Sequence, residues 1–481
     1  MDVLVINPPM VINRKPTFPS FGIDFIVQVL EQNAHKVELL DIDAYRYSRE
    51  HVCETIHKSR AEVIAIGGLV TVYPYLTWLV PQIRKIKPSC TIILGGPLAS
   101  SLKERCFDEL DIDGIVIGEG EVTVVELLKE ICGGRDLSRV QGIAYKADGK
   151  ILFTPQRGLM PGLDHLLRFD DTRFPMEDLL QTTSGVFQLH VQRGCPSNCT
   201  FCFNAFRVVG KNVRYRPAQH VVDDMVYFKN KYKDKITLFA LTGECITMSK
   251  SWVRDFTRAL TDSKLKVKYR VTSRVDTIDA ERMAWLKESG CTIISFGLES
   301  GSDRILKIMK KNVTAEKSLR AVHLAKKYFN EIQASIILGY VGEDRITLRE
   351  TVDFCKRLGL RPSFFYATPF PGTELYDTAK ANGNIVDEKA YLMDLDRSMI
   401  SDFNLNLTTM PEHEARMAIA EAKREVENYY FMYDLIHLKI FYYIFYTVKT
   451  QGLSTLLNKI TNRLRSLSTK INSALPPSEK P

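Results

Sequence analysis

The segment Gly-Cys-Pro-Ser-Asn-Cys-Thr-Phe-Cys, residues 194–202, places three cysteines four and three residues apart, directly after a stretch typical of a buried strand. A structural zinc site takes four ligands, usually as two pairs. The nearest further candidates, Cys245, His190 and His220, are not paired with this loop. A 4Fe-4S cluster held by only three thiolates keeps one iron open for another ligand. The segment therefore predicts a reactive iron–sulfur cluster on a loop that follows a strand.

Strands and helices alternate around and beyond this segment. Six apolar runs are typical of buried strands, and they span residues 186–192, 236–242, 266–272, 292–297, 332–338 and 363–367. This order predicts a partial (β/α)6 barrel over residues 186–385, whose chemistry lies at the C-terminal ends of its strands. Before it, residues 136–185 are expected to form a connector, with a hairpin at Asp148-Gly149.

Residues 1–135 contain five strand–helix units in a row. Their strands, expected at 3–7, 37–41, 63–67, 91–95 and 114–118, are apolar on both faces, as in a parallel sheet covered by helices on both sides. This order predicts an α/β fold with a doubly wound, Rossmann-like sheet, which binds ligands beyond the carboxyl ends of its strands. A dinucleotide is not expected, because the first strand ends in Asn-Pro-Pro at residues 7–9 rather than in a glycine-rich turn.

Glycine-rich turns do follow the third, fourth and fifth strands of this sheet. Glycine allows a backbone to approach a ligand closely. Any one of these turns could serve only to shape a tight bend, but three at one edge favour a ligand groove. The residues concerned are Gly67, Gly68, Gly95, Gly96, Pro97, Gly118, Glu119 and Gly120.

Residues 386–481 are expected to form a helical C-terminal region. Residues 431–448 are aromatic and aliphatic, but Asp434 and Lys439 make a membrane span unfavourable. Leucines and isoleucines between Leu453 and Leu475 recur at helical spacing, with Lys and Arg on the other faces. This pattern predicts a basic amphipathic helix that either binds a bilayer surface or packs against protein.

The composition limits the class of protein. Of 481 residues, 45% are hydrophobic and 25% charged, as in globular enzymes. The net charge of +8 is small for this length, and the last 33 residues hold six Lys or Arg and one Glu. A nucleic-acid partner is therefore not expected. Seven of the ten cysteines are scattered singly, unlike a secreted disulfide scaffold. We expect a cytoplasmic protein without a signal peptide.

The spacing CxxxCxxC, with the aromatic Phe201 before the last cysteine, resembles the signature of radical S-adenosylmethionine (SAM) enzymes. In that family the open iron binds the amino and carboxylate groups of SAM. An electron from the cluster then cleaves SAM to methionine and a 5′-deoxyadenosyl radical. The resemblance implies that the cluster ligands, which are both metal-binding and catalytic, are Cys195, Cys199 and Cys202.

The resemblance also extends to residues at the ends of later barrel strands. It implies that Glu244, in the string Thr-Gly-Glu, accepts from the SAM ammonium group. Arg274 is expected to meet the SAM carboxylate, and the string Gly-Leu-Glu-Ser-Gly-Ser at 297–302 is expected near the ribose. The complete set of implied SAM-binding residues is Phe201, Gly243, Glu244, Ser273, Arg274, Glu299, Ser300 and Gly339.

Within that family the chain is similar to the cobalamin-binding radical SAM enzymes. The glycine-rich turns at 95–97 and 118–121 resemble motifs of their N-terminal domain, so the turn residues named above are implied to bind cobalamin. Methionine synthase and the mutases supply a histidine to cobalt from the loop after the first strand. Residues 7–22 contain no histidine, so cobalamin is expected in the base-off state without a histidine ligand.

These similarities imply a cobalamin-dependent methyltransferase acting on an unactivated carbon of a hydrophobic or natural-product-like small molecule. Two alternatives stay open: a radical oxidoreductase or cyclase on the same scaffold, with a tetrapyrrole or lipid substrate, and a non-catalytic iron–sulfur protein. A flavodoxin or ferredoxin is expected as reductant. The C-terminal helix suggests peripheral contact with the inner face of a membrane and a lipid-like substrate.

Overall fold

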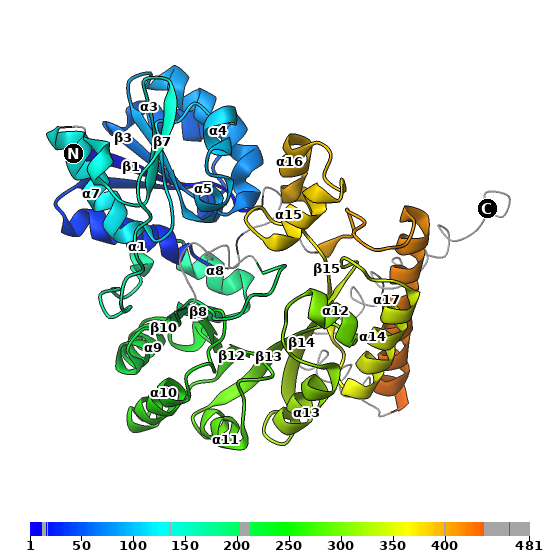
Figure 1. Cartoon of the computed structure of the whole chain (residues 1–481). Helices are drawn as coiled ribbons and strands as arrows, with labels where there is room; N and C mark the ends of the chain where they lie inside the picture. Colours follow the sequence, from blue (N-terminus) through cyan, green and yellow to red (C-terminus); the bar gives the residue numbers. More distant parts are fainter. Residues whose placement is uncertain are drawn as a thin grey trace.

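Two sheets, parallel except for an antiparallel hairpin at the edge of the first, account with their helices for most of the chain (Figure 1). The structure is a computed structural model, which describes residues 1–11, 16, 18–134, 136–202, 212–398, 401–436 and 461. The N-terminal sheet and its helices form one layered unit, and the second sheet with its helices forms a half-barrel. The predicted fold class, a doubly wound sheet followed by a partial barrel and a helical region, is confirmed.

The N-terminal sheet has seven strands in the order β2-β1-β3-β4-β5-β6-β7. The first five are parallel. Helices α1 and α7 cover one face, and α3 to α6 cover the other. The bounds are β1 Asp2–Asn7, α1 Phe21–Gln32, β2 Lys36–Asp41, α2 Ile42–Tyr45, α3 Arg49–Lys58, β3 Val63–Gly67, α4 Tyr73–Ile86, β4 Thr91–Gly95, α5 Gly96–Leu102, α6 Arg105–Glu109, β5 Gly114–Val116 and α7 Gly120–Gly133.

The hairpin that the sequence assigns to the connector belongs to this sheet. Strands β6 (Ile143–Ala147) and β7 (Lys150–Phe153) pair antiparallel, and β6 pairs with β5. The sheet therefore continues beyond residue 135. The sequence predicts the hairpin but not the sheet that it joins. The turn signal is local and does not specify which sheet edge pairs with the hairpin.

The half-barrel has six parallel strands in the order β15-β14-β13-β12-β11-β8. Each lies within a few residues of its predicted position. The bounds are α8 Met176–Thr182, β8 Val186–His190, α9 Ala218–Tyr232, β11 Leu238–Thr242, α10 Lys250–Asp262, β12 Tyr269–Ser273, α11 Ala280–Glu288, β13 Cys291–Glu299, α12 Asp303–Ile308, α13 Ala315–Lys326, β14 Glu331–Leu338, α14 Arg345–Leu358, β15 Ser363–Tyr366 and α15 Glu374–Ala381.

Two C-terminal helices complete the described chain. Helix α17 (Glu412–Ile436) packs along α14 of the half-barrel, whereas α16 (Glu388–Ser398) returns to the N-terminal unit (Figure 1). The predicted amphipathic helix and most of residues 431–448 lie outside the described residues. None of the helices in the described part of the chain combines the length and hydropathy needed to cross a bilayer.

Helix α16, which follows the barrel in the sequence, packs against the N-terminal unit. Leu392 and Leu395 are buried in the same core as Leu4 and Ile64. At the rim, Arg105 pairs with Glu388 at 2.9 Å. The position of the N-terminal unit over the barrel therefore depends in part on a helix that follows the barrel in sequence.

We predict that Leu392→Ala lowers the free energy of unfolding by about 2–5 kcal/mol, because it leaves a cavity in a close-packed core. The midpoint of urea unfolding, followed by circular dichroism, measures the loss. The control Val386→Ala trims a side chain that is 91% exposed just before the same helix, and should change stability by less than about 0.5 kcal/mol. Equal effects of the two substitutions would contradict this role of α16.

Candidate functional site

A cavity of about 410 Å³ lies at the carboxyl edge of the N-terminal sheet and reaches the start of the half-barrel. Its N-terminal wall includes all eight residues of the glycine-rich turns that the sequence singled out. Its barrel wall consists of His190, Arg193, Gly194, Arg214 and Glu244. The structure therefore joins the edges of both units in one space. Cobalamin binding by the turn residues stays a prediction.

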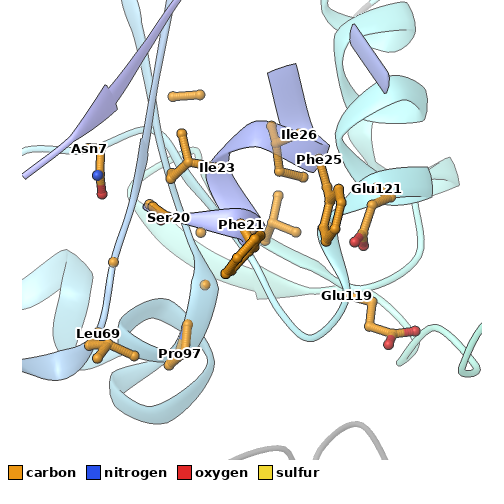
Figure 2. Close-up of a pocket in the computed structure, with 18 of the residues that line it drawn as sticks. Asn7, Ser20, Phe21, Ile23, Phe25, Ile26, Leu69, Pro97, Glu119 and Glu121 are labelled. Carbon is orange, nitrogen blue, oxygen red and sulfur yellow. The ribbon is translucent and has the colours of Figure 1, made fainter. Parts of the chain in front are cut away.

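Part of the cavity extends between the sheet and helix α1. On the sheet side Val5, Ala65 and Ile93 are neighbours in register on adjacent strands and face the same way. On the helix side Ile23 and Ile26 line the space, with Phe21 and Phe25 nearby (Figure 2). This deep arm is apolar and suits an aromatic or aliphatic group rather than a charged one.

Two of the glycines in these turns leave little room for a side chain. A Cβ atom at Gly68 would lie 2.7 Å from Val72 Cγ2. Gly96 has a φ of +77°, and a Cβ there would lie 3.1 Å from the Gly68 carbonyl oxygen. A φ of this sign favours glycine. The turns are thus packed against one another and present backbone to the cavity.

Ion pairs join the two units beside the cavity. Arg193 reaches Glu119 at 3.3 Å and Glu121 at 2.6 Å, and Arg214 reaches Glu119 at 2.8 Å. Burial acts to raise the pKa of Glu119, but the hydrogen bond from Arg214 and the charge of Arg193 outweigh it and hold the pKa below its usual range. The sequence analysis singled out neither arginine, because their acidic partner Glu119 lies far away in the sequence, in the N-terminal unit.

The cysteine loop is anchored by its middle residue. The Thr200 N–H donates to the Met309 carbonyl at 3.0 Å, and its carbonyl accepts from Leu375 N–H at 2.9 Å. The Thr200 hydroxyl lies 2.6 Å from the Tyr340 hydroxyl. Residues that follow the fourth, fifth and sixth barrel strands thus hold the loop at the carboxyl edge of the half-barrel.

Two cations approach this loop. Arg274 Nη1 lies 3.8 Å from Cys199 Sγ, and Lys311 Nζ lies 5.9 Å from the centre of the Phe201 ring. Burial raises the pKa of the Cys199 thiol, while the charges of Lys311 and Arg274 act in the opposite direction. Positive charge near a thiol favours the thiolate, which is the metal-binding form.

The described residues contain no group of three His, Cys, Asp or Glu side chains placed closely enough to hold a metal ion. Ligation of a cluster by Cys195, Cys199 and Cys202 therefore stays a prediction. The donor set fits an iron–sulfur cluster, since it consists of thiols next to cations.

Glu244, predicted to accept from an ammonium group, has an orphaned oxygen. Its Oε2 is buried and has no hydrogen-bond partner among the described residues. Burial raises the pKa of Glu244. Gly243 beside it is crowded, because a Cβ there would lie 2.6 Å from Gln192 Oε1. An unpaired buried acceptor next to the cysteine loop fits a cationic ligand group.

Arg274 and Glu299 are already engaged within the protein. Arg274 forms two hydrogen bonds with Asp276, both at 2.9 Å, and Glu299 pairs with the buried Lys311 at 2.7 Å. The sequence analysis missed Lys311, which follows a short helix and carries no strand-end signal.

The remaining predicted residues lie at strand ends. The Ser273 hydroxyl lies 2.5 Å from that of Thr247, and the Ser300 hydroxyl 3.2 Å from that of Thr351. Gly339 has a φ of +79° and donates its N–H to Glu343 Oε2 at 2.6 Å. Burial raises the pKa of Glu343 to about 8. Roles of these residues in SAM binding stay predictions.

Comparison with known proteins covers both units. Residues 8–128 match the model of the B12 binding domain, and residues 189–355 match that of the Radical SAM superfamily. The chain is 29% identical over 389 residues to an uncharacterised methyltransferase of Pyrococcus horikoshii, covering 79% of this chain and 84% of the relative. It is 24% identical to the cytidylyl-2-hydroxyethylphosphonate methyltransferase of Streptomyces wedmorensis, covering 83% and 85%.

Solved structures agree with the fold. The radical SAM methyltransferase TsrM from Kitasatospora setae, with cobalamin and a 4Fe-4S cluster bound, superimposes with a TM-score of 0.69 at 17% identity, over 88% of this chain and 90% of that one. The cobalamin-dependent radical SAM enzyme OxsB gives 0.65 at 18% identity, over 81% and 56%. With both family models matched along the chain, this protein combines a B12 binding domain with a radical SAM domain, whose cofactors are cobalamin and a 4Fe-4S cluster with SAM.

Proposed function

We propose that this protein is a cobalamin-dependent radical SAM methyltransferase that methylates an unactivated carbon of a small molecule. The observation that carries the proposal is the cavity shared by the two units, whose walls are the glycine turns on one side and the base of the cysteine loop on the other. A methyl donor and a radical source can serve one substrate only if their sites open onto a common space.

The residues around the cysteine loop would bind and orient the first pair of cofactors. When bound, the cluster and SAM would supply the radical chemistry that activates a carbon–hydrogen bond of the substrate. Cys195, Cys199 and Cys202 would hold the cluster, with the guanidinium group of Arg274 next to Cys199. Glu244 would accept a hydrogen bond from the SAM ammonium group through its orphaned Oε2.

The glycine turns would hold cobalamin, which supplies the methyl group. The turns present backbone to the cavity, and the apolar arm beside α1 suits the aromatic base at the end of the cobalamin nucleotide tail. No histidine occurs between residues 7 and 22, which supports base-off binding. His190 also lines the cavity, but its Nε2 accepts from Arg193 at 3.4 Å. Burial and the nearby arginines lower the pKa of His190 to about 3, so it is neutral.

A radical cyclase is the second candidate, because the chain is 25% identical to the anaerobic magnesium-protoporphyrin IX monomethyl ester cyclase of Synechocystis, covering 68% of this chain and 67% of the relative. Two methyltransferases match over a larger share of the chain, which favours methyl transfer.

We further propose that a flavodoxin or ferredoxin is the reductant and that the substrate is hydrophobic. We also propose that the protein is cytoplasmic and contacts the inner membrane face through its C-terminal segment.

We predict methyl transfer from SAM. Anaerobically reconstituted holoenzyme, dithionite and trideuteromethyl-labelled SAM are incubated with a small-molecule extract of the source cells. Mass spectrometry should find a methylated product three mass units heavier than the one formed with unlabelled SAM, together with 5′-deoxyadenosine. Cys199→Ala should abolish both, whereas Cys132→Ser, at an exposed thiol of the N-terminal unit, should abolish neither. Deoxyadenosine with only unmethylated products would favour the cyclase.

We predict that Ala65→Phe weakens binding of hydroxocobalamin at least tenfold, because the ring would fill the apolar arm between β3 and α1. Equilibrium dialysis with absorbance detection measures the affinity. Cleavage of SAM by the reduced cluster should persist, since the substitution lies away from the cysteine loop. Leu152→Phe, at an exposed position on β7, is the matched control and should bind hydroxocobalamin normally. Normal binding by Ala65→Phe would contradict this assignment of the arm.

We predict that removal of residues 449–481 weakens binding to vesicles that contain anionic lipid. This segment holds six Lys or Arg and one Glu, and each basic residue near an anionic surface contributes about 1 kcal/mol. Co-sedimentation with phosphatidylglycerol vesicles measures binding, and neutral phosphatidylcholine vesicles are the control. Equal binding by the full and shortened chains would contradict the membrane proposal.

A further inference from the structure

The ion pairs between the two units form a compact, mostly buried group. Glu119 sits between Arg193 and Arg214, and Glu121 binds the far side of Arg193. All four side chains are at most 17% exposed, so solvent screens their charges only weakly. We call Glu119, Glu121, Arg193 and Arg214 the interdomain clamp.

The arginines of the clamp stand at the two ends of the cysteine loop. Strand β9 (Gln192–Arg193) precedes the loop and β10 (Arg214–Tyr215) follows it, and the two strands pair antiparallel with Arg214 directly opposite Arg193. Like charges directly opposite each other destabilise a strand pair. Glu119 contacts both guanidinium groups and thereby stabilises the base of the loop that carries the three cysteines.

The acids of the clamp stand at the cobalamin side of the same wall. Glu119 ends the turn after β5, Glu121 lies in the first turn of α7, and both line the cavity. Glu119 also accepts from the Met160 N–H at 3.2 Å, while Arg214 donates to the Met160 carbonyl at 3.0 Å. A shift of this turn therefore moves both ends of the cysteine loop.

We propose that the interdomain clamp couples the two cofactor sites. SAM bound to the barrel raises the affinity for cobalamin, and bound cobalamin raises the affinity for SAM. The proposal rests on the proposed function, since it needs both ligands. A ligand that holds the turn after β5 in one position also holds Glu119. Through its ion pairs, Glu119 then holds Arg193 and Arg214, which stand at the two ends of the cysteine loop. Coupling between two sites is reciprocal. Glu119, Arg193 and Arg214 are thus positioning residues rather than catalytic ones.

The test measures the coupling directly in cluster-reconstituted protein. Hydroxocobalamin is titrated, with quenching of protein fluorescence as the signal, in the absence and presence of saturating SAM and without reductant, so that SAM stays intact. In the unaltered protein SAM should tighten cobalamin at least about fivefold. Glu119→Gln keeps the shape but removes the charge, and should reduce this factor below twofold with unchanged iron content. Glu119→Asp, which restores the charge, should recover most of it.

Glu126→Gln is the matched control, because Glu126 pairs with Arg157, lies on α7 of the N-terminal unit and does not line the cavity. It should keep full coupling. If Glu119→Gln does not fold, Glu121→Gln removes the second acid and should reduce the factor in the same direction. Full coupling in both variants, or none in the unaltered protein, overturns the clamp. An unaltered protein that binds no hydroxocobalamin at all instead overturns the proposed function, and the clamp with it.

Discussion

The arrangement of this protein depends on the charges that join the carboxyl edges of its two sheets. Glu119 from the N-terminal unit lies between Arg193 and Arg214 from the barrel. Removing one partner of such a buried group leaves an uncompensated charge, which is far more costly than the pair is stabilising. The two edges are therefore held face to face, and both sets of strand-end loops open onto one cavity.

A second attachment at the other side of the molecule is apolar. Helix α16 buries Leu392 and Leu395 in the core of the N-terminal unit, and Tyr391 donates to the carbonyl of Pro369 at 2.6 Å. Apolar packing is not directional, whereas the ion pairs are. Helix α16 thus helps to hold the two units together, and the charged group fixes their register beside the cavity.

The positions of the strands could be predicted closely, because buried parallel strands are continuous apolar runs. The carboxyl edges could be predicted to carry the site, because ligands bind beyond the carboxyl ends of the strands in sheets of this topology. All eight turn residues of the N-terminal sheet line the cavity. The sequence did not predict that β6 and β7 extend the first sheet, or that Arg193, Arg214 and Lys311 supply the charges of the site. These features are pairings between segments far apart in sequence, and a local pattern does not encode the partner.

Four carboxylates at strand ends, Glu119, Glu244, Glu299 and Glu343, look alike in the sequence, but their surroundings separate them. Glu119 and Glu299 are neutralised by arginine or lysine. Glu343 is fully buried and accepts from its own turn through Oε2, whereas its Oε1 also has no partner among the described residues, but Glu343 does not line the cavity. Glu244 alone among these four both lines the cavity and keeps an unpartnered buried oxygen. An unsatisfied buried acceptor costs about 1–3 kcal/mol, and a cationic ligand group would remove that cost. This difference supports the proposal that Glu244 accepts from a cationic ligand group, while the predicted cofactor contacts of Glu119 and Glu299 stay predictions.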